Sequence, residues 1–303
     1  MIMSLPKVSV VITCYNYGEY VGSALESVFA QTFQDFEIIL IDDGSTDDSE
    51  KIIRSFLVDN RLKYYRHTNS GQAIAKNRGI VKAKGEFIAF LDADDKWEKA
   101  KLEKQIPLFS DRDIGVVFSR AKYIDDKDQL LNFSLTDRYL QPRSGRVTNY
   151  LYIDNFIPFS SSVVRKKCIS NLGSFDETLP MGIDWDLWLR LSTECLFSYV
   201  DEPLLLYRVG HAGQMSKNAI VRHNCADRIM DKFNRNYPGF VDTKTQKKAR
   251  YYTLCNRSEY YSVRQPWQGI CLSFDAIKQK PWHVKSYQGF LLACRHLLIY
   301  GIK

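Results

Sequence analysis

The chain has 303 residues, of which 45% are hydrophobic and 25% charged, a composition that indicates a globular protein with a sizeable core and excludes a fibrous or disordered chain. Its net charge of +7 is unevenly distributed. Residues 211–303 contain 16 Lys and Arg and 5 Asp and Glu, a net charge of +11, which leaves −4 for residues 1–210. The seven cysteines follow no metal-binding or disulfide spacing, so we expect reduced thiols.

The two ends of the sequence bear on location and partners. The first residues, MIMSLPKVSVVITCYN, enter a strand-like run with no basic lead and no cleavage site, so we expect a cytoplasmic protein. No apolar run has the length needed to span a bilayer. The basic C-terminal part could meet nucleic acid or an anionic membrane surface, and it contains no recognisable nucleic-acid module. We therefore expect no nucleic-acid partner.

Short apolar runs alternate with helix-like stretches near the N-terminus. The runs are rich in β-branched residues and too short for buried helices, so they predict buried strands. The alternation predicts an α/β fold with a doubly wound, mainly parallel sheet, in which ligands bind beyond the carboxyl ends of the strands. The expected strands are residues 7–13, 36–42, 61–67 and 86–92, and the expected helices are residues 19–32, 47–58 and 72–83.

The sequence after residue 110 is less regular. Residues 114–124 and 159–165 predict short strands, residues 184–192 have apolar side chains at helical spacing, and residues 196–209 predict strands around a turn. The remainder predicts mainly helix. We expect an α/β domain at residues 1–210 and a basic, mainly helical region at residues 211–303.

Three aspartates end the expected strand in FIAFLDADDKW, residues 87–97. Like charges this close repel one another, and they need a positive partner if they are to leave water. Asp95 is expected as the N-cap of a following helix. Asp92 and Asp94, one residue apart at a strand end, are placed to bind a hard divalent cation such as Mg²⁺ or Mn²⁺.

The stretch DDGSTDDS directly follows the strand at residues 36–42. Gly44 suits a tight bend, and Ser45 or Thr46 suits a helix cap. Asp42 and Asp43 end the strand, where an outward carboxylate can accept the N–H of a nucleobase. The spacing fits both a turn with a helix cap and a site that contacts a nucleobase.

The stretch NSGQAIAKNRG, residues 69–79, places Gly71 at an expected helix start. Lys76, Asn77 and Arg78 follow one turn later. Backbone N–H groups, the helix dipole and the cations suit a diphosphate. An ordinary amphipathic helix with a solvated basic face fits the same residues equally well.

Five stretches in this order resemble family 2 of the inverting glycosyltransferases, of the bacterial surface-polysaccharide type. The resemblance implies a GT-A nucleotide-sugar-binding and catalytic domain with a helical C-terminal extension, and it covers about residues 7–210. The stretches are VSVVITCYNYGEYVGSALESVFAQTF, DFEIILIDDGSTDDS, NSGQAIAKNRGI, GEFIAFLDADD, and DWDLWLRL followed by YR.

The resemblance implies a nucleotide-sugar site built from several loops. Thr13 and Tyr15 would line the nucleoside pocket, with the Tyr15 ring facing the base. Asp43 would accept the N3–H of a pyrimidine. Lys76 and Asn77 match positions that contact the nucleotide in the family.

The resemblance also implies a cofactor, Mn²⁺ or Mg²⁺, bound by Asp94. Asp92 would lie near the ribose, and Ala93 belongs to the same nucleotide-sugar-binding set. Arg208 follows a tyrosine as in the family, where a basic residue faces the phosphates. His211 could add a metal ligand, but VGHAG has one residue more before the histidine than the usual pattern, and a histidine in a surface loop is the alternative.

Asp184 aligns with the family's catalytic base. Ile183 replaces the glutamate that usually precedes this base, which weakens any orienting role of that acid. An N-cap for the helix at residues 184–192 is the alternative role for Asp184, and both roles are compatible. Asp186 is expected to be solvated or structural.

These features predict an inverting, metal-dependent hexosyltransferase that moves one sugar from a nucleotide diphosphate donor, UDP first, to a hydroxyl of a glycan. The glycan would be a lipid-linked acceptor in capsule, exopolysaccharide or O-chain synthesis. A nucleotidyltransferase is an alternative, although TCYNYGEY lacks the Gly-rich basic loop usual in that class. A non-catalytic nucleotide-sugar-binding protein is a further alternative.

The end of the chain has an apolar stripe at helical spacing. In KSYQGFLLACRHLLIYGIK the stripe is flanked by Lys285, Arg295 and Lys303. It predicts either peripheral docking on the inner face of the cell membrane or packing on its own domain. The stripe consists of Tyr287, Phe290, Leu291, Cys294, Leu297 and Leu298.

Overall fold

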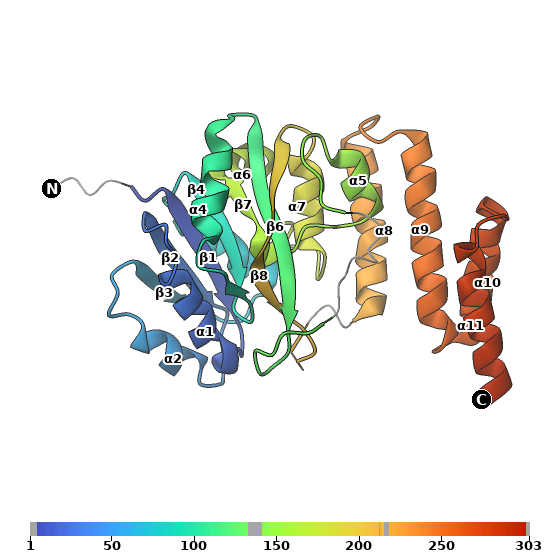
Figure 1. Ribbon diagram of the computed structural model, residues 1–303, viewed down its shortest axis with the longest axis horizontal. Coiled ribbons are helices and arrows are strands. Elements are labelled where there is room, and N and C mark those ends of the chain that lie inside the picture. The colour runs from blue at the N-terminus through green and yellow to red at the C-terminus, as the bar shows by residue number, and fades with distance from the viewer. Residues whose placement is uncertain (1–4, 133–140, 212, 215–217, 301–303) are drawn as a thin grey trace. The chain divides into compact units, whose positions relative to one another are not determined.

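The computed structural model describes residues 5–132, 141–211, 213–214 and 218–300 (Figure 1). The chain forms two compact units. Unit 1 comprises Met1–Thr148 and Phe156–Phe233, and unit 2 comprises Asn149–Asn155 and Asn234–Lys303. The units divide near the end of the helix α8 (Ala219–Asn236), whereas the change of charge suggested a division at residue 210.

Within the described residues, unit 1 contains an eight-stranded sheet in the order β3-β2-β1-β4-β7-β6-β8-β5. Thr13 of β1 pairs with Asp92 of β4, and Cys14 pairs with Asp42 of β2, so the carboxyl ends of these strands meet at one edge, here termed the carboxyl edge. Four parallel strands confirm the first four predicted ones: β1 (Val8–Cys14), β2 (Phe36–Asp42), β3 (Leu62–Arg66) and β4 (Phe87–Asp92).

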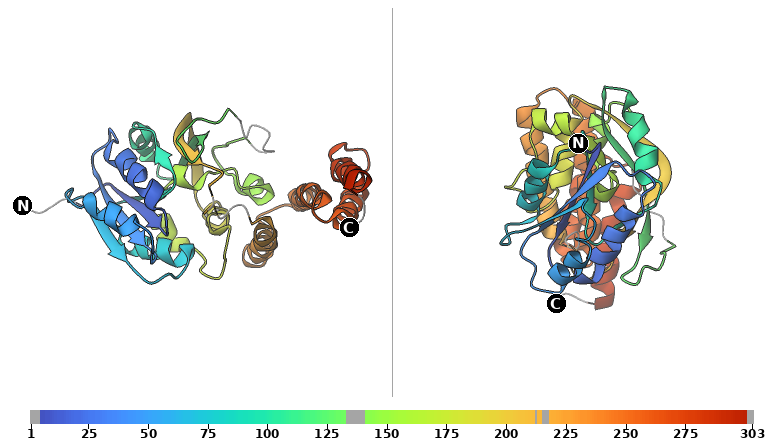
Figure 2. Two further views of the ribbon diagram at one scale, coloured as in Figure 1. Left: turned by 90° about the horizontal axis from the view of Figure 1, so that it is seen from below. Right: turned by 90° about the vertical axis from the view of Figure 1, so that its left-hand side faces the viewer.

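Helices pack on both faces of these parallel strands (Figure 2). Alternate residues of a strand point to opposite faces, so Val10 and Ile12 of β1 join the core with helices α1 and α2, and Val11 meets α3. Gly79 of α3 lies so close to Val11 that an added Cβ would come within 2.4 Å of its side chain. The bounds are α1 (Gly18–Phe29), α2 (Ser49–Ser55) and α3 (Gln72–Lys82).

The second half of the sheet is mixed. β7 is antiparallel to β4 and β6, β8 is parallel to β6, and β5 is antiparallel to β8. The predicted turn within residues 196–209 is wrong. Val200 pairs with Ser119 and Pro203 with Arg120, so the chain between them bulges and then continues the same strand. The bounds are β5 (Lys96–Trp97), β6 (Ile114–Ile124), β7 (Val163–Arg165) and β8 (Leu196–Arg208).

The remaining elements are mostly helical, and the predicted helix at residues 184–192 is confirmed as α7. Residues 159–165 divide into a 3₁₀ turn, η3, and the short strand β7. The bounds in unit 1 are α4 (Lys101–Gln105), η1 (Ile106–Ser110), η3 (Phe159–Ser161), α6 (Lys166–Leu172) and α7 (Ile183–Leu191). The other bounds are α5 (Thr148–Ile153), α9 (Thr243–Ser262), α10 (Pro266–Gln279) and α11 (Lys285–Tyr300).

Lys101 places an amine in the core of unit 1. Its side chain is fully buried, and no described residue offers a hydrogen-bond partner to Nζ, which lies 3.9 Å from the centroid of the Trp97 ring. Burial holds the pKa of the Lys101 amine well below its usual range. Folding therefore disfavours the charged form of this amine relative to the unfolded chain.

We expect Lys101→Met to stabilise unit 1, because methionine fills similar space without a buried polar group. The free energy of unfolding should rise by about 1–3 kcal/mol at pH 7. In the unfolded chain Lys101 binds a proton below pH ~10, so the native protein gains stability relative to the variant as pH rises from 7. Denaturant unfolding at pH 7 and pH 10 should show the difference shrinking.

The matched control for that experiment is Lys99→Met, because Lys99 is exposed two residues away. It should change the unfolding free energy little at either pH. A destabilised Lys101→Met protein, or a gain that does not change with pH, would contradict a neutral, unpaired amine.

Candidate functional site

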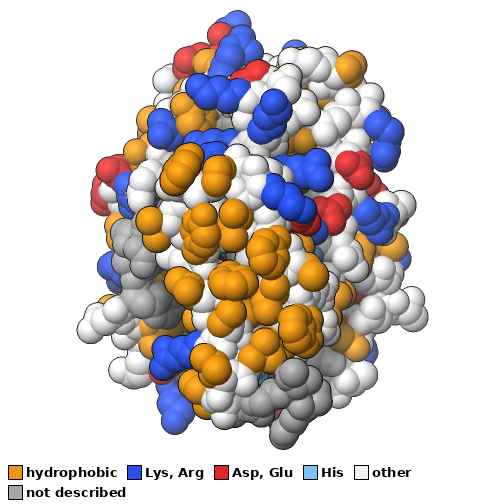
Figure 3. Space-filling view, turned by 90° about the vertical axis from the view of Figure 1, so that its right-hand side faces the viewer, with side chains coloured by type: hydrophobic (Ala, Val, Ile, Leu, Met, Phe, Trp, Pro, Cys, Tyr) orange, Lys and Arg blue, Asp and Glu red, His pale blue; other side chains and the backbone are white. Residues whose placement is uncertain are grey.

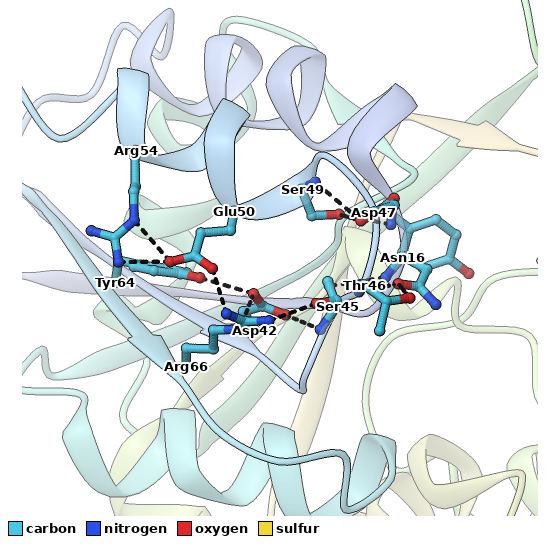
Figure 4. Close-up of polar contacts among 11 residues, drawn as sticks. Asn16, Asp42, Ser45, Thr46, Asp47, Ser49, Glu50, Arg54, Tyr64 and Arg66 are labelled. Atoms are coloured by element: carbon cyan, nitrogen blue, oxygen red, sulfur yellow. Dashed lines mark hydrogen bonds and ion pairs between the residues drawn. The ribbon is translucent and has the colours of Figure 1, made fainter.

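Side-chain hydrogen bonds connect the β1–α1 loop and the β2–α2 loop at the carboxyl edge (Figure 4). The Asn16 carboxamide oxygen accepts from the Thr46 N–H at 2.7 Å, and the Ser45 hydroxyl accepts from the Asn16 N–H at 3.0 Å. The predicted helix cap at Ser45 or Thr46 is therefore wrong, and Asp48 occupies the N-cap position of α2. The predicted tight bend at Gly44 is confirmed by its φ of +86°.

The two aspartates that end β2 point in different directions. Asp42 is fully buried and accepts from the Ser45 N–H and the Tyr64 hydroxyl, each at 2.8 Å (Figure 4). The prediction that the Asp42 carboxylate points outward is therefore wrong. Its role is to hold the turn that follows β2 against β3.

Asp43 fixes the start of α3. Its carboxylate accepts from the Ser70 N–H at 3.1 Å, the Ser70 hydroxyl at 2.8 Å and the Gly71 N–H at 2.8 Å. Arg78 lies 3.7 Å away. The Ser70 N–H contacts both oxygens, so these bonds already use most of the acceptor sites of the carboxylate. Its predicted contact with a nucleobase stays a prediction.

Lys76 connects two strand ends of the carboxyl edge. Its buried ammonium lies 2.7 Å from Asp92 Oδ1 and 3.1 Å from the Thr13 hydroxyl. Desolvation raises the pKa of the Asp92 carboxyl, Lys76 opposes that rise, and the charge of Asp94 adds to it. The structure thus brings together Thr13, Lys76 and Asp92, three of the predicted nucleotide-sugar residues.

Asn77 takes part in a different set of contacts. Its amide nitrogen donates to the Phe175 carbonyl and to Glu177 at 2.9 Å each, and its oxygen accepts from the Phe175 N–H at 2.9 Å. These bonds attach α3 to the loop that leads toward α7. The predicted contact between Asn77 and the nucleotide has no support in this arrangement and stays a prediction.

Asp94 and His211 lie side by side although they are far apart in the sequence. His211 Nε2 is 2.9 Å from Asp94 Oδ2. The histidine is only 6% exposed, so the alternative of a histidine in a surface loop is wrong. Its ring packs against Tyr17 and Tyr20, at centroid distances of 5.7 and 5.3 Å.

The Asp94–His211 pair has donors suited to a divalent cation. Carboxylate oxygen and imidazole nitrogen both bind Mn²⁺, and neighbouring ligands of an octahedral ion lie about 3 Å apart, which the 2.9 Å separation matches. No group of three or more His, Cys, Asp or Glu side chains among the described residues converges as a metal site.

Asp95 has a different role from the predicted N-cap. The residues after it form β5 rather than a helix, and the Asp95 side chain is 2% exposed. Its carboxylate accepts from the Ser160 hydroxyl at 2.5 Å and from the Arg208 N–H at 2.9 Å. Ser160 Oγ also accepts from the Asp92 N–H at 3.1 Å. Asp95 therefore anchors the turn that carries Asp92 and Asp94.

Arg208 is buried beneath the same turn. Its guanidinium donates to the Asp94 carbonyl at 2.8 Å, to the Asp125 carbonyl at 2.6 Å and to the Asp128 carboxylate at 2.5 Å. It also lies 4.6 Å from the centroid of the Tyr20 ring. These contacts position the aspartate turn, and a contact between Arg208 and a phosphate stays a prediction.

Asp184 lies in the first turn of α7. The N-cap of this helix is Gly182, with φ of +75°, so the predicted N-cap role of Asp184 is wrong. Ile183 is buried. Asp186 is structural, because it accepts from Arg190 Nε at 2.9 Å and Lys232 Nζ at 2.7 Å and is only 3% exposed.

The remaining predicted site residues differ in exposure. Tyr15, in the β1–α1 loop, is 45% exposed, whereas Ala93 is fully buried. Sequence reasoning missed Tyr17 and Tyr20, which flank His211, and Ser160, which holds Asp95 and the Asp92 N–H. The three-residue spacing of the tyrosines in YNYGEY was the available signal for the first two. Ser160 is one of three consecutive serines, and nothing in the sequence distinguishes it from the other two.

Curated relatives are named as glycosyltransferases. One of Methanocaldococcus jannaschii is 30% identical over 258 residues, which cover 83% of this chain and 79% of that protein. One of Rickettsia felis is 26% identical over 274 residues, covering 88% of this chain and 44% of that protein. TuaG of Bacillus subtilis, named for teichuronic acid biosynthesis, is 39% identical over 116 residues, 38% of this chain and 46% of that protein. The chain thus spans less than half the length of the latter two.

Solved structures show the same fold. S. aureus TarS 1–349 in complex with UDP has a TM-score of 0.64 at 18% identity, over 96% of this chain and 88% of that one. The mannosyltransferase PcManGT from Pyrobaculum calidifontis, in complex with GDP-Man and Mn²⁺, has a TM-score of 0.64 at 16% identity, over 98% and 89%. The mixed sheet and its helices are thus the GT-A fold.

The match to a family agrees with the resemblance seen in the motifs. The model described as Glycosyl transferase family 2 matches residues 9–173, more than half of the chain. Those residues include the strands and loops that carry Thr13, Asp43 and Asp94, and the helix α3 that carries Lys76. The fold, the match to the family model and the relatives together show that the chain belongs to glycosyl transferase family 2.

Proposed function

We propose that the chain transfers one sugar from a UDP-sugar to a hydroxyl of a glycan acceptor, with inversion at the anomeric carbon. The observation that carries the proposal is the 2.9 Å contact between His211 and Asp94, whose turn also carries Asp92 with its partner Lys76. A divalent cation would bring the positive charge that these carboxylates need, and the diphosphate of the nucleotide would complete its coordination. The TarS structure bound to UDP supports this nucleotide.

Asp94 and His211 would hold Mn²⁺ or Mg²⁺, and the complex of PcManGT with Mn²⁺ supports this assignment. The cation would neutralise charge on the departing diphosphate. The protein's own contribution is to fix these ligands. Arg208 holds the Asp94 carbonyl, and Tyr17 and Tyr20 enclose the His211 ring.

Asp184 would act as the catalytic base. It would take the proton of the acceptor hydroxyl as that oxygen forms its bond to the anomeric carbon and the bond to the diphosphate breaks. Attack opposite the leaving group inverts the anomeric carbon in a single step. No covalent bond between the sugar and the protein is needed, which agrees with an aspartate used only for proton transfer.

The acceptor would be a lipid-linked glycan of a bacterial surface polysaccharide. TuaG, named for teichuronic acid biosynthesis, supports this class of product. A lipid-linked acceptor would be met at the inner face of the cell membrane, so we propose a cytoplasmic enzyme that associates peripherally with that face.

A screen of nucleotide sugars with Mn²⁺ tests the donor. Thermal stabilisation and slow hydrolysis should be strongest with one UDP-sugar. Binding without any turnover would favour the non-catalytic alternative, and transfer of a nucleotidyl group from UTP would favour a nucleotidyltransferase.

Asp94→Asn should abolish transfer and weaken UDP binding in Mn²⁺, because an amide is a poorer ligand for a hard cation. Transfer assays and UDP titrations with and without EDTA measure both effects. The wild-type enzyme should lose activity in EDTA and regain it on addition of Mn²⁺. Full activity in EDTA would contradict a role for the metal.

Asp184→Asn should keep donor affinity and slow the chemical step by about a hundredfold or more. Single-turnover transfer and UDP titration separate the two quantities. Asp186→Asn provides the contrast, because its buried bonds to Arg190 and Lys232 should make its main effect a lower thermal stability. Loss of donor binding with intact turnover in Asp184→Asn would contradict the assignment.

Ser160→Ala should raise the Mn²⁺ concentration needed for half-maximal activity by about tenfold, because Asp95 loses a bond that positions the turn. Ser161→Ala is the matched control, since Ser161 is equally buried and donates to the Pro158 carbonyl instead. Both variants should unfold more easily, and only Ser160→Ala should change the Mn²⁺ titration. Equal titrations would show that Ser160 is merely structural.

A further inference from the structure

Small residues form the contacts between the helices of unit 2. The helix α11 buries Ser286, Gly289 and Ala293, which lie on one face. A Cβ added to Gly289 would come within 2.3 Å of Ser258 Oγ on α9. The Ser262 hydroxyl of α9 donates to the Gly289 carbonyl at 2.6 Å. These helices therefore approach each other closely through side chains that bury little apolar surface.

The helix α10 packs in the same way. It buries Gly269, Ser273 and Ala276. A Cβ added to Gly269 would lie 2.7 Å from the Ser262 backbone nitrogen. Tyr251, Cys255 and Ala276 form a small buried apolar cluster in unit 2.

Several large apolar side chains of α10, α11 and the loop between them are exposed to solvent. Figure 3 shows hydrophobic side chains gathered on the face that α10 and α11 form, with Lys and Arg at the margin. Trp282, in the loop between the two helices, is 96% exposed, and Leu298 is 87% exposed. The exposed apolar side chains define the α10–α11 face: Trp267, Phe274, Trp282, Val284, Tyr287, Leu291 and Leu298.

Soluble helix bundles bury large apolar side chains and expose small or polar ones. Unit 2 differs from this pattern, because small residues lie between α9, α10 and α11 while several large apolar residues are exposed, as is typical of helices in contact with lipid. No helix in the described part of the chain is long and apolar enough to cross a membrane. The pattern therefore fits helices that lie on a membrane surface rather than span it.

The charge around the face selects the kind of surface. Residues 263–300 contain five Lys and Arg and one acidic residue, Asp275, which pairs with Lys278 at 3.4 Å. A symmetric contact between two copies of this face would set like charges against each other. An anionic leaflet would instead attract them, and exposed tryptophans such as Trp282 and Trp267 favour the boundary between headgroups and acyl chains.

We propose that the α10–α11 face binds an anionic membrane surface, with Trp282 inserted at the headgroup level. The proposal deepens the peripheral location given under the proposed function, and the face would bring the enzyme to a lipid-linked acceptor. The interaction itself involves only unit 2 and lipid. It requires neither donor, metal nor acceptor, so vesicle binding and sugar transfer can fail independently.

Cosedimentation of the full chain with vesicles tests the proposal. Binding should be strong to phosphatidylcholine mixed with phosphatidylglycerol and weak to phosphatidylcholine alone. Trp282→Ser combined with Leu298→Ser should weaken binding to the mixed vesicles by about tenfold or more. The matched control is Val58→Ser, which removes an equally exposed apolar side chain, 94% exposed, from unit 1.

Charge reversal tests the electrostatic part. Arg295→Glu should weaken binding to the mixed vesicles by about fivefold or more, and Lys51→Glu on unit 1 should not. Asp94→Asn should bind vesicles as the wild type does even though it transfers no sugar. Tryptophan fluorescence should shift to shorter wavelength on binding in the wild type, and the shift should be smaller when Trp282 is absent.

Three outcomes would overturn the proposal. The first is no vesicle binding by the intact chain. The second is binding that Trp282→Ser with Leu298→Ser and Arg295→Glu leave unchanged. The third is a concentration-dependent dimer, detected by light scattering and lost in the same variants, which would assign the face to a second copy of the chain.

Discussion

The candidate site depends on how one buried carboxylate, that of Asp95, is held. Three aspartates within four residues repel one another, and desolvation together with the charges of Asp94 and Asp92 raises the pKa of the Asp95 carboxyl well above its usual range. The Ser160 hydroxyl and the Arg208 N–H oppose that rise by donating to it. Because Asp95 faces inward, the other two side chains are free to serve the carboxyl edge, one beside Lys76 and one beside His211.

The sequence predicted the parallel strands and the loops at their ends well, because β-branched runs and short spacings are local signals. It did not predict which way neighbouring side chains point, as Asp42 and Asp43 illustrate, since one residue along a strand reverses the direction. It also missed the inward role of Asp95, whose partners lie 65 and 113 residues away. Distant pairing leaves no trace in a single sequence.

Unit 2 illustrates a second limit of sequence patterns. The periodicity of Tyr287, Leu291 and Leu298 predicted a helix with an apolar stripe, and α11 is that helix. The stripe left open whether it packs on the protein or meets another surface. In the structure α11 packs on α9 through Gly289 and the small residues near it, on a different face from the stripe. Hydrogen bonds and a close backbone approach hold these two helices together. A pattern of hydrophobic residues does not predict contacts between small residues of this kind.

The long-range contacts beneath Asp94 have a consequence for synthesis of the chain. Arg208 and His211 lie 114 and 117 residues after the aspartate that they contact. A ribosome that has translated only the first half of the protein has already produced the aspartate turn but none of these partners. Until residue 211 has left the exit tunnel, Asp92 has its partner Lys76, but Asp94 lacks the contacts that Arg208 and His211 provide. The aspartate turn should therefore reach its final arrangement late in translation, after the strand β8 has docked, and shortened products of stalled translation should lack that arrangement.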